Sequence, residues 1–99
     1  MDSATTLIVT AKPNADQMES VQEYLGGVLP LLISVGGRPV KRLKVHQVIR
    51  GAPSGMVLVM DFDSSEAIEG MFDSDDYAAL IPARDRGFSE MNIMLTQEM

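Results

Sequence analysis

The chain lacks cysteine and tryptophan altogether, and it has one histidine among its 99 residues. The missing cysteine excludes disulfides, cysteine-ligated zinc, iron–sulfur clusters and thiol catalysis. The single histidine excludes a multi-histidine metal site within one chain. The acidic runs "DFDSSE" and "DSDD" are interpreted first as helix caps, so we expect neither a metal nor another cofactor.

Long apolar runs and an excess of positive charge are also missing. No stretch approaches the roughly 18 apolar residues of a membrane span. The N-terminal "MDSATTLIVT" lacks the basic and long apolar regions of a signal peptide, so we expect a cytoplasmic protein. The formal net charge of -6 argues against nucleic acids and anionic membranes as partners.

The residues that are present suit one globular domain over residues 1–99, with 45% hydrophobic and 22% charged residues. Their periodicity predicts the element order β-α-β-β-α-β. The predicted strands are 5–11, 38–50, 56–62 and about 89–97, and the predicted helices start near residues 14 and 63. This order is that of the ferredoxin-like unit, an α+β fold whose four-stranded antiparallel sheet carries helices on one face.

Capping and helix-breaking residues set the expected helix ends. Asn14 is expected to cap the first helix, and Ser74 to cap a second segment of the last one. Pro30 is expected to kink the first helix, and Pro82 to break or kink the last one. The glycine pair at 36–37 should end the first helix, because glycine accepts a positive φ.

The predicted strands 5–11 and 56–62 are apolar on both faces. Helices on one side of the sheet would cover only one of those faces. A second copy of the sheet would cover the other, and we therefore expect a homodimer.

Charge is unevenly distributed along the chain. Five of the eight basic residues lie between positions 38 and 50, and seven of the fourteen acidic residues lie between 61 and 76. Pairing of these two segments within one chain is the simpler interpretation. The basic segment could also face a partner or hold a small anion.

Three stretches together resemble a known family, namely "GGR", "MVLVMDFDSSEA" and "DSDDYAALIPAR". They are similar to the bacterial family called domain of unknown function 1330, within the dimeric α+β barrel superfamily, over roughly residues 5–97. The matching positions are Gly36, Gly37, Arg38, Arg42, Phe62, Ser64, Ala67, Phe72, Ser74, Tyr77 and Arg84. Pro39 and Leu43 depart from the family pattern, which has an aromatic residue and a glycine there. The resemblance implies sheet-to-sheet dimerisation and no general reaction.

The candidate site residues are His46, as a catalytic base, and Arg38, Arg42, Tyr77 and Arg84, as ligand-binding residues. On the predicted strand, His46 shares a face with basic residues that would lower its pKa and leave a neutral imidazole near pH 7. An exposed histidine on an edge strand is the simpler alternative. Tyr77 and Arg84 are seven residues apart, so they would share one face of a straight helix.

Two functions remain open on these residues. In the first, the barrel cavity of the dimer binds a small polar or anionic organic molecule. Cofactor-independent acid/base chemistry would then use His46 as the base and an arginine to stabilise negative charge. In the second, the protein is a non-catalytic dimerisation module with a packed interior. The volume of the cavity separates the two hypotheses.

Overall fold

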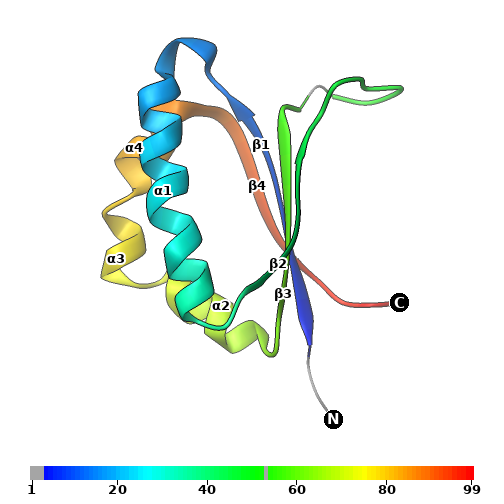
Figure 1. The fold of residues 1–99 in the computed structure, drawn as a ribbon, viewed down its shortest axis with the longest axis vertical. Helices are drawn as coiled ribbons and strands as arrows, with labels where there is room; N and C mark the ends of the chain where they lie inside the picture. The colour runs from blue at the N-terminus through cyan, green and yellow to red at the C-terminus, as the bar shows by residue number, and fades with distance from the viewer. Residues whose placement is uncertain (1–3, 53) are drawn as a thin grey trace.

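A four-stranded antiparallel sheet in the order β2-β3-β1-β4 forms one layer, and all the helices lie on one side of it (Figure 1). The computed structural model describes residues 4–52 and 54–99. The elements are β1 (Thr5–Pro13), η1 (Ala15–Gln17), α1 (Met18–Ser34), β2 (Arg38–Lys44), β3 (Met56–Phe62), α2 (Ser65–Phe72), α3 (Asp75–Ala78), α4 (Ile81–Gly87) and β4 (Phe88–Thr96). The predicted α+β ferredoxin-like fold is confirmed.

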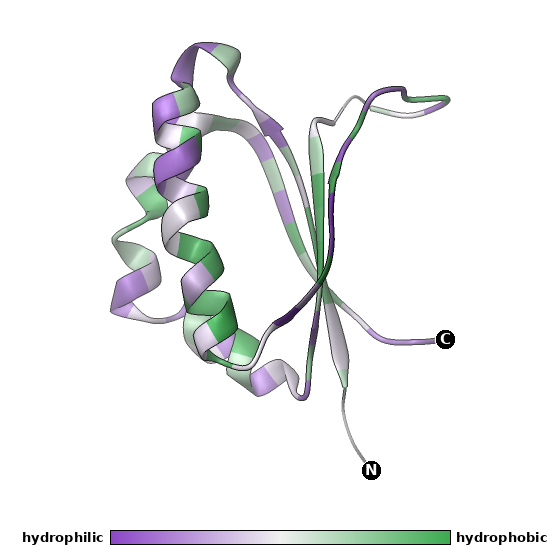
Figure 2. Ribbon diagram, viewed as in Figure 1, coloured by the Kyte–Doolittle hydropathy of each residue, from purple (hydrophilic) through white to green (hydrophobic). Residues whose placement is uncertain are grey.

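The core lies between the sheet and the helical layer. Figure 2 shows apolar residues on the side of α1 that faces the sheet. The buried hydrophobic residues come from both layers and are Leu7, Ala11, Val21, Tyr24, Val28, Leu32, Leu58, Met60, Phe62, Ile68, Met71, Tyr77, Ala83 and Phe88. They occupy alternate positions in β1 and β3 and helical spacing in α1, which are the periodicities of residues that share one face.

The opposite face of the sheet is apolar at its centre. Ile8 in β1 pairs with Val59 in β3 and with Met94 in β4, so the three side chains point the same way. Ile8 and Val59 are half-buried, and Met94 is exposed. The helices pack against the other side, so no layer formed by residues 4–52 and 54–99 of the same chain covers this face.

The second strand is shorter than predicted, and β2 ends at Lys44 rather than at residue 50. Lys44 pairs with Met56, the first residue of β3, so the residues that follow have no partner strand. Residues 45–52 instead begin an arm that projects away from the helices (Figure 1). Its base is held by a hydrogen bond from Val45 N to Gly55 O at 2.8 Å. The prediction that His46 lies on a strand is therefore wrong.

The predicted helix ends are correct in part. Asn14 does not cap through its side chain, which instead donates to the carbonyl of Arg86 at 3.0 Å. Helix α1 continues through Pro30. Ser74 caps α3 as predicted, accepting from Tyr77 N at 3.2 Å. Pro82 lies in the first turn of α4, where its missing amide hydrogen costs no helical hydrogen bond.

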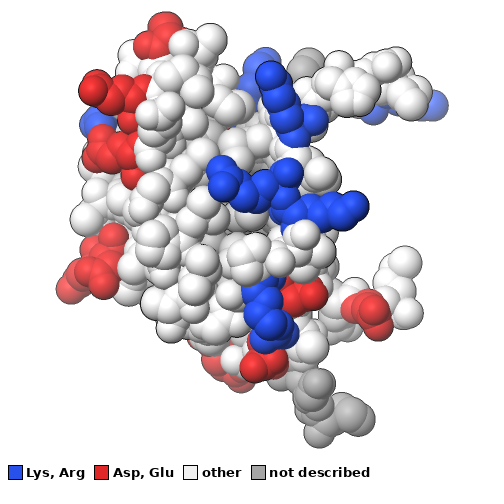
Figure 3. All heavy atoms as spheres, viewed as in Figure 1, with Lys and Arg blue, Asp and Glu red and all other residues white. Residues whose placement is uncertain are grey.

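Basic and acidic side chains occupy different parts of the surface. In Figure 3 most of the Lys and Arg atoms in view lie on the β2 side, and acidic atoms lie over the helical layer at the left edge. Among residues 4–52 and 54–99, the basic and acidic segments are joined by one ion pair, from Arg38 to Asp63 at 3.1 Å. Both side chains are exposed, so this pair adds little stability.

A glycine pair forms the tight connection from α1 to β2. Gly36 has a φ of 97°, and Gly37 N donates to Leu32 O at 2.9 Å. A Cβ on Gly37 would lie 2.7 Å from Leu32 O and 2.7 Å from Phe62 Cζ. The connection therefore has no room for a side chain at position 37.

We expect Gly37→Ala to lower the free energy of unfolding by about 1–3 kcal/mol through overpacking. Gly26 lies inside α1 with no atom within 4 Å of a built Cβ, so Gly26→Ala is the matched control. It should raise stability by up to about 1 kcal/mol. Urea denaturation of the three proteins measures both effects, and equal stabilities for the two variants would contradict the packing described for Gly37.

Candidate functional site

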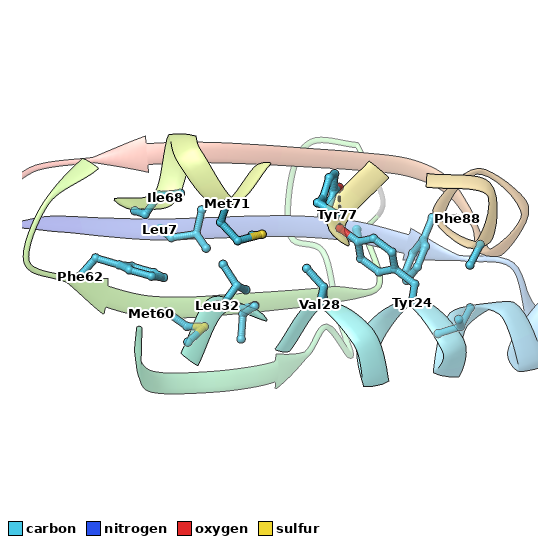
Figure 4. Close-up of a cluster of buried hydrophobic side chains, with 14 residues drawn as sticks. Leu7, Tyr24, Val28, Leu32, Met60, Phe62, Ile68, Met71, Tyr77 and Phe88 are labelled. Atoms are coloured by element: carbon cyan, nitrogen blue, oxygen red, sulfur yellow. Dashed lines mark hydrogen bonds between the residues drawn. The ribbon is translucent and has the colours of Figure 1, made fainter. Parts of the chain in front are cut away.

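Two tyrosines and an arginine from three different helices meet inside the helical layer. The hydroxyl oxygens of Tyr24 in α1 and Tyr77 in α3 lie 2.8 Å apart, as the dashed line in Figure 4 marks. Arg84 in α4 donates from Nη1 to the Tyr77 hydroxyl at 3.2 Å. Tyr24 and Tyr77 are each 3% exposed, so these polar atoms are paired inside the core.

The local fold fixes the position of the Tyr77 ring. Ser74 caps α3 and also donates to Met71 O at 2.6 Å, which joins α3 to the end of α2. The Tyr77 ring packs edge-on against Phe72, with centroids 4.8 Å apart, and against Tyr24, with centroids 6.1 Å apart. Such contacts hold an aromatic ring in one orientation.

Arg84 approaches Tyr77 across the break between α3 and α4. The two residues meet even though the helix predicted to join them is interrupted. Nε of Arg84 donates to Oδ1 of Asp85 at 3.2 Å, and its guanidinium carbon lies 6.0 Å from the Tyr77 ring centroid. The hydrogen bond to Tyr77 is the main cause that raises the pKa of Arg84 above its ordinary value, so this side chain stays a cation.

Burial raises the pKa of Tyr24 far above its ordinary value, and the hydrogen bond to Tyr77 adds to this effect. Both causes disfavour the phenolate. Tyr24 is therefore a neutral hydroxyl, with a hydrogen to donate, throughout the physiological range.

A hollow of about 510 Å³ lies beside this pair, between the α2–α4 segment and the edge strand β4. Its apolar lining is Ile68, Phe72, Ile81, Ile93 and Leu95, and its polar lining is Glu69, Asp73, Tyr77 and Arg84. Ile93 and Leu95 alternate along β4 and share the sheet face that looks toward the helices. The hollow thus combines five apolar and four polar lining residues.

The other predicted site residues lie elsewhere. Arg38 lines a polar hollow with Thr6 and Asp61, on the far side of the sheet from the helices. Arg42 lies over the groove between β2 and α1. His46 is exposed on the arm after β2. The structure therefore brings Tyr77 and Arg84 together, and within the described residues of one chain it does not bring the other three to them.

Tyr24 is a site residue that the sequence analysis missed. It lies three residues after Val21 and four before Val28, both buried, so it occupies the apolar stripe of α1. A tyrosine at such a position needs a partner for its hydroxyl. That rule could have marked Tyr24 as half of a buried polar pair, although the sequence does not show which partner it has.

Within residues 4–52 and 54–99, no three His, Cys, Asp or Glu side chains are grouped closely enough to hold a metal ion. No helix in that part of the chain has the length and apolarity needed to cross a membrane.

Solved structures with this architecture place the chain in the ferredoxin-like fold class. A protein of unknown function from Rhodopseudomonas palustris has a TM-score of 0.83 at 14% identity, covering 99% of this chain and 85% of its own. A dimeric protein of unknown function from Bacteroides fragilis has a TM-score of 0.63 at 11% identity, covering 96% of both chains. A DABB-family protein from Mesorhizobium loti has a TM-score of 0.68 at 15% identity, covering 100% and 99%.

The sequence profile of the family described as domain of unknown function (DUF1330) matches residues 6–99. The chain belongs to that family, as its glycine pair, Ser74, Tyr77 and Arg84 indicated. No curated protein matches the chain.

The raised pKa of Tyr24 predicts a loss of stability at alkaline pH. Above about pH 10 the unfolded chain releases the Tyr24 proton while the folded chain keeps it, which lowers the free energy of unfolding by about 1.4 kcal/mol per pH unit. Below that pH both states hold the proton, and this contribution to stability is complete. Tyr24→Phe should remove this part of the loss of stability above about pH 10. Urea denaturation of the wild-type protein and the variant between pH 8 and 11 measures this difference. If the free energies of unfolding of the two proteins fall equally with pH, the raised pKa of Tyr24 is contradicted.

Proposed function

We propose that the protein binds a small organic molecule in the hollow beside Tyr77 and Arg84. The observation that carries this proposal is the hydrogen-bonded group of Tyr24, Tyr77 and Arg84, because Tyr77 and Arg84 line a hollow that also has five apolar lining residues. A volume of about 510 Å³ lies within the range of small-molecule sites, which are mainly apolar with a few fixed polar groups.

The charges around the hollow favour a polar ligand over an anionic one. Arg84 supplies one positive charge, but Glu69 and Asp73 line the same hollow and Asp85 binds the Arg84 guanidinium. The whole chain also carries a net charge of -6, which repels anions at long range. We place this function in the cytoplasm, as the sequence predicts.

The open face of the sheet supports a second proposal, that the protein is a homodimer. The apolar centre at Ile8, Val59 and Met94 has no covering layer among the described residues of one chain. The arm after β2 projects to the side of the sheet away from the helices, with Ile49 92% exposed (Figure 1). A second copy would cover both features. The similar protein from Bacteroides fragilis is described as dimeric.

Acid/base chemistry with His46 as the base stays a proposal that depends on this dimer. Among the described residues of one chain, those that line the hollow beside Tyr77 do not include His46. The exposed arm would have to carry His46 of one copy to the hollow of the other. Cofactor-free proton transfer would then need that second copy.

A non-catalytic dimerisation module with a packed interior is the second candidate function. It is supported by the close packing deep under α1, where the cavity that Tyr24, Val28 and Leu58 line measures about 20 Å³. In this case the Tyr24–Tyr77 pair would serve to join the helices, and the open face of the sheet would be the functional surface.

Acetophenone, an apolar ring with one carbonyl, is a suitable first probe of the hollow. We expect it to shift the backbone amide resonances of the lining residues in β4 and α4 with a Kd on the order of 1 mM, as for a fragment-sized ligand. Ile93→Trp should fill the hollow and abolish the shifts. Ile33→Trp, on the exposed face of α1, is the matched control and should keep them. Equal binding by the two variants would place the ligand elsewhere and refute the proposed site.

The homodimer is tested with lysine on the open face of the sheet. Ile8→Lys should convert a dimer to a monomer in sedimentation velocity at micromolar concentration, because the interface would bury an unpaired charge. Ile33→Lys, at an exposed position of α1, should stay dimeric. A monomeric wild-type protein, or an unaffected Ile8→Lys variant, would contradict the proposed interface.

A further inference from the structure

The hydrogens around Tyr77 can be assigned from the chemistry of its neighbours. A guanidinium has N–H donors and no acceptor, so the Tyr77 oxygen accepts the 3.2 Å bond from Arg84 Nη1. The 2.8 Å bond between the two tyrosines could run in either direction. Each hydroxyl has one hydrogen, so the direction of this bond decides which tyrosine has a hydrogen left over.

The surroundings of Tyr24 exclude a hydrogen bond in which Tyr77 is the donor and Tyr24 the acceptor. Tyr24 would then keep a free hydrogen that needs an acceptor of its own. Within the described residues its hydroxyl bonds to Tyr77 alone, and the cavity of about 20 Å³ beside Tyr24 is otherwise lined by apolar residues. A buried hydroxyl hydrogen without an acceptor carries the full cost of desolvation. Tyr24 therefore donates to Tyr77.

The Tyr77 oxygen then accepts two hydrogen bonds, from Arg84 and from Tyr24, and its own hydrogen remains. Tyr77 lines the hollow of about 510 Å³ together with Arg84, and that hollow has room for an acceptor. We infer that Tyr77 donates its hydroxyl hydrogen into this hollow, to a neutral carbonyl oxygen of the bound molecule, and that Tyr24 and Arg84 are positioning residues. This inference rests on the proposed function.

The chemistry of the hollow selects a carbonyl among the possible acceptors. A carbonyl oxygen has two lone pairs and no hydrogen, so it suits a site that presents donors. A carboxylate would also accept, but Glu69 and Asp73 line the same hollow and would repel it. The five apolar lining residues suit a hydrocarbon body. The ligand class is thus a small ketone, aldehyde or ester with an apolar body.

Three probes with the same ring separate this inference from the proposed function. They are acetophenone, which has a neutral carbonyl, ethylbenzene, which has no acceptor, and benzoate, which has a charged one. Amide chemical-shift titration of the full chain gives the three Kd values. One neutral hydrogen bond should make acetophenone bind about fivefold more tightly than ethylbenzene. Benzoate should bind more weakly than acetophenone.

Tyr77→Phe should bring the ratio of the acetophenone and ethylbenzene affinities to about one and leave the ethylbenzene Kd unchanged. The constant ethylbenzene Kd shows that the hollow is intact. Tyr24→Phe should reduce the ratio about twofold, because the Tyr77 hydroxyl is then free to rotate. A purely structural role for Tyr24 would change both affinities equally.

Several results would overturn the inference. They are equal binding of acetophenone and ethylbenzene by the wild-type protein, a ratio that Tyr77→Phe leaves unchanged, or tighter binding of benzoate. In each of these cases the hollow still binds a ligand and the proposed function stands. Binding of none of the three probes would remove the proposed function together with the inference.

Discussion

The hydrogen bond between the Tyr24 and Tyr77 hydroxyls is the interaction on which the site depends. It joins residues 53 positions apart in the sequence and ties α1 to α3. A phenol hydroxyl inside a core must be paired, and Tyr77 is the partner that allows the Tyr24 hydroxyl to be buried. Arg84 adds a charged donor to the same oxygen, and this ties α4 to the pair. The three helices are thereby arranged around one oxygen atom, next to the hollow at the edge of the sheet.

The two faces of the sheet differ in what they carry. The face under the helices holds the core, and its margin at β4 forms the apolar wall of the hollow. The open face has an apolar centre and carries Arg38 and Asp61 nearer its rim. The proposed ligand site and the proposed dimer interface thus lie on opposite sides of a single sheet and share no residues.

The fold could be predicted from the sequence because its signals are local. The apolar run at 56–62 marked β3 at its observed bounds, and Ser74 marked the start of α3. The end of β2 could not be predicted, because it depends on where β3 begins and not on residues 45–50 themselves. Asn14 has the right chemistry for a cap, but its amide binds the Arg86 carbonyl, 72 residues away. Half of the site could be predicted for the same reason. Tyr77 and Arg84 lie only seven residues apart in the sequence, whereas Tyr24 reaches them through tertiary packing alone.

The proposed site depends on Tyr24 donating to Tyr77, which leaves the Tyr77 hydrogen facing the hollow. Neutron diffraction from crystals exchanged into D₂O locates these hydrogens directly as deuterium. We expect the deuterium of Tyr24 on the line between the two hydroxyl oxygens, and the deuterium of Tyr77 directed into the hollow toward a water or ligand atom. Deuterium of Tyr77 pointing at the Tyr24 oxygen would contradict it.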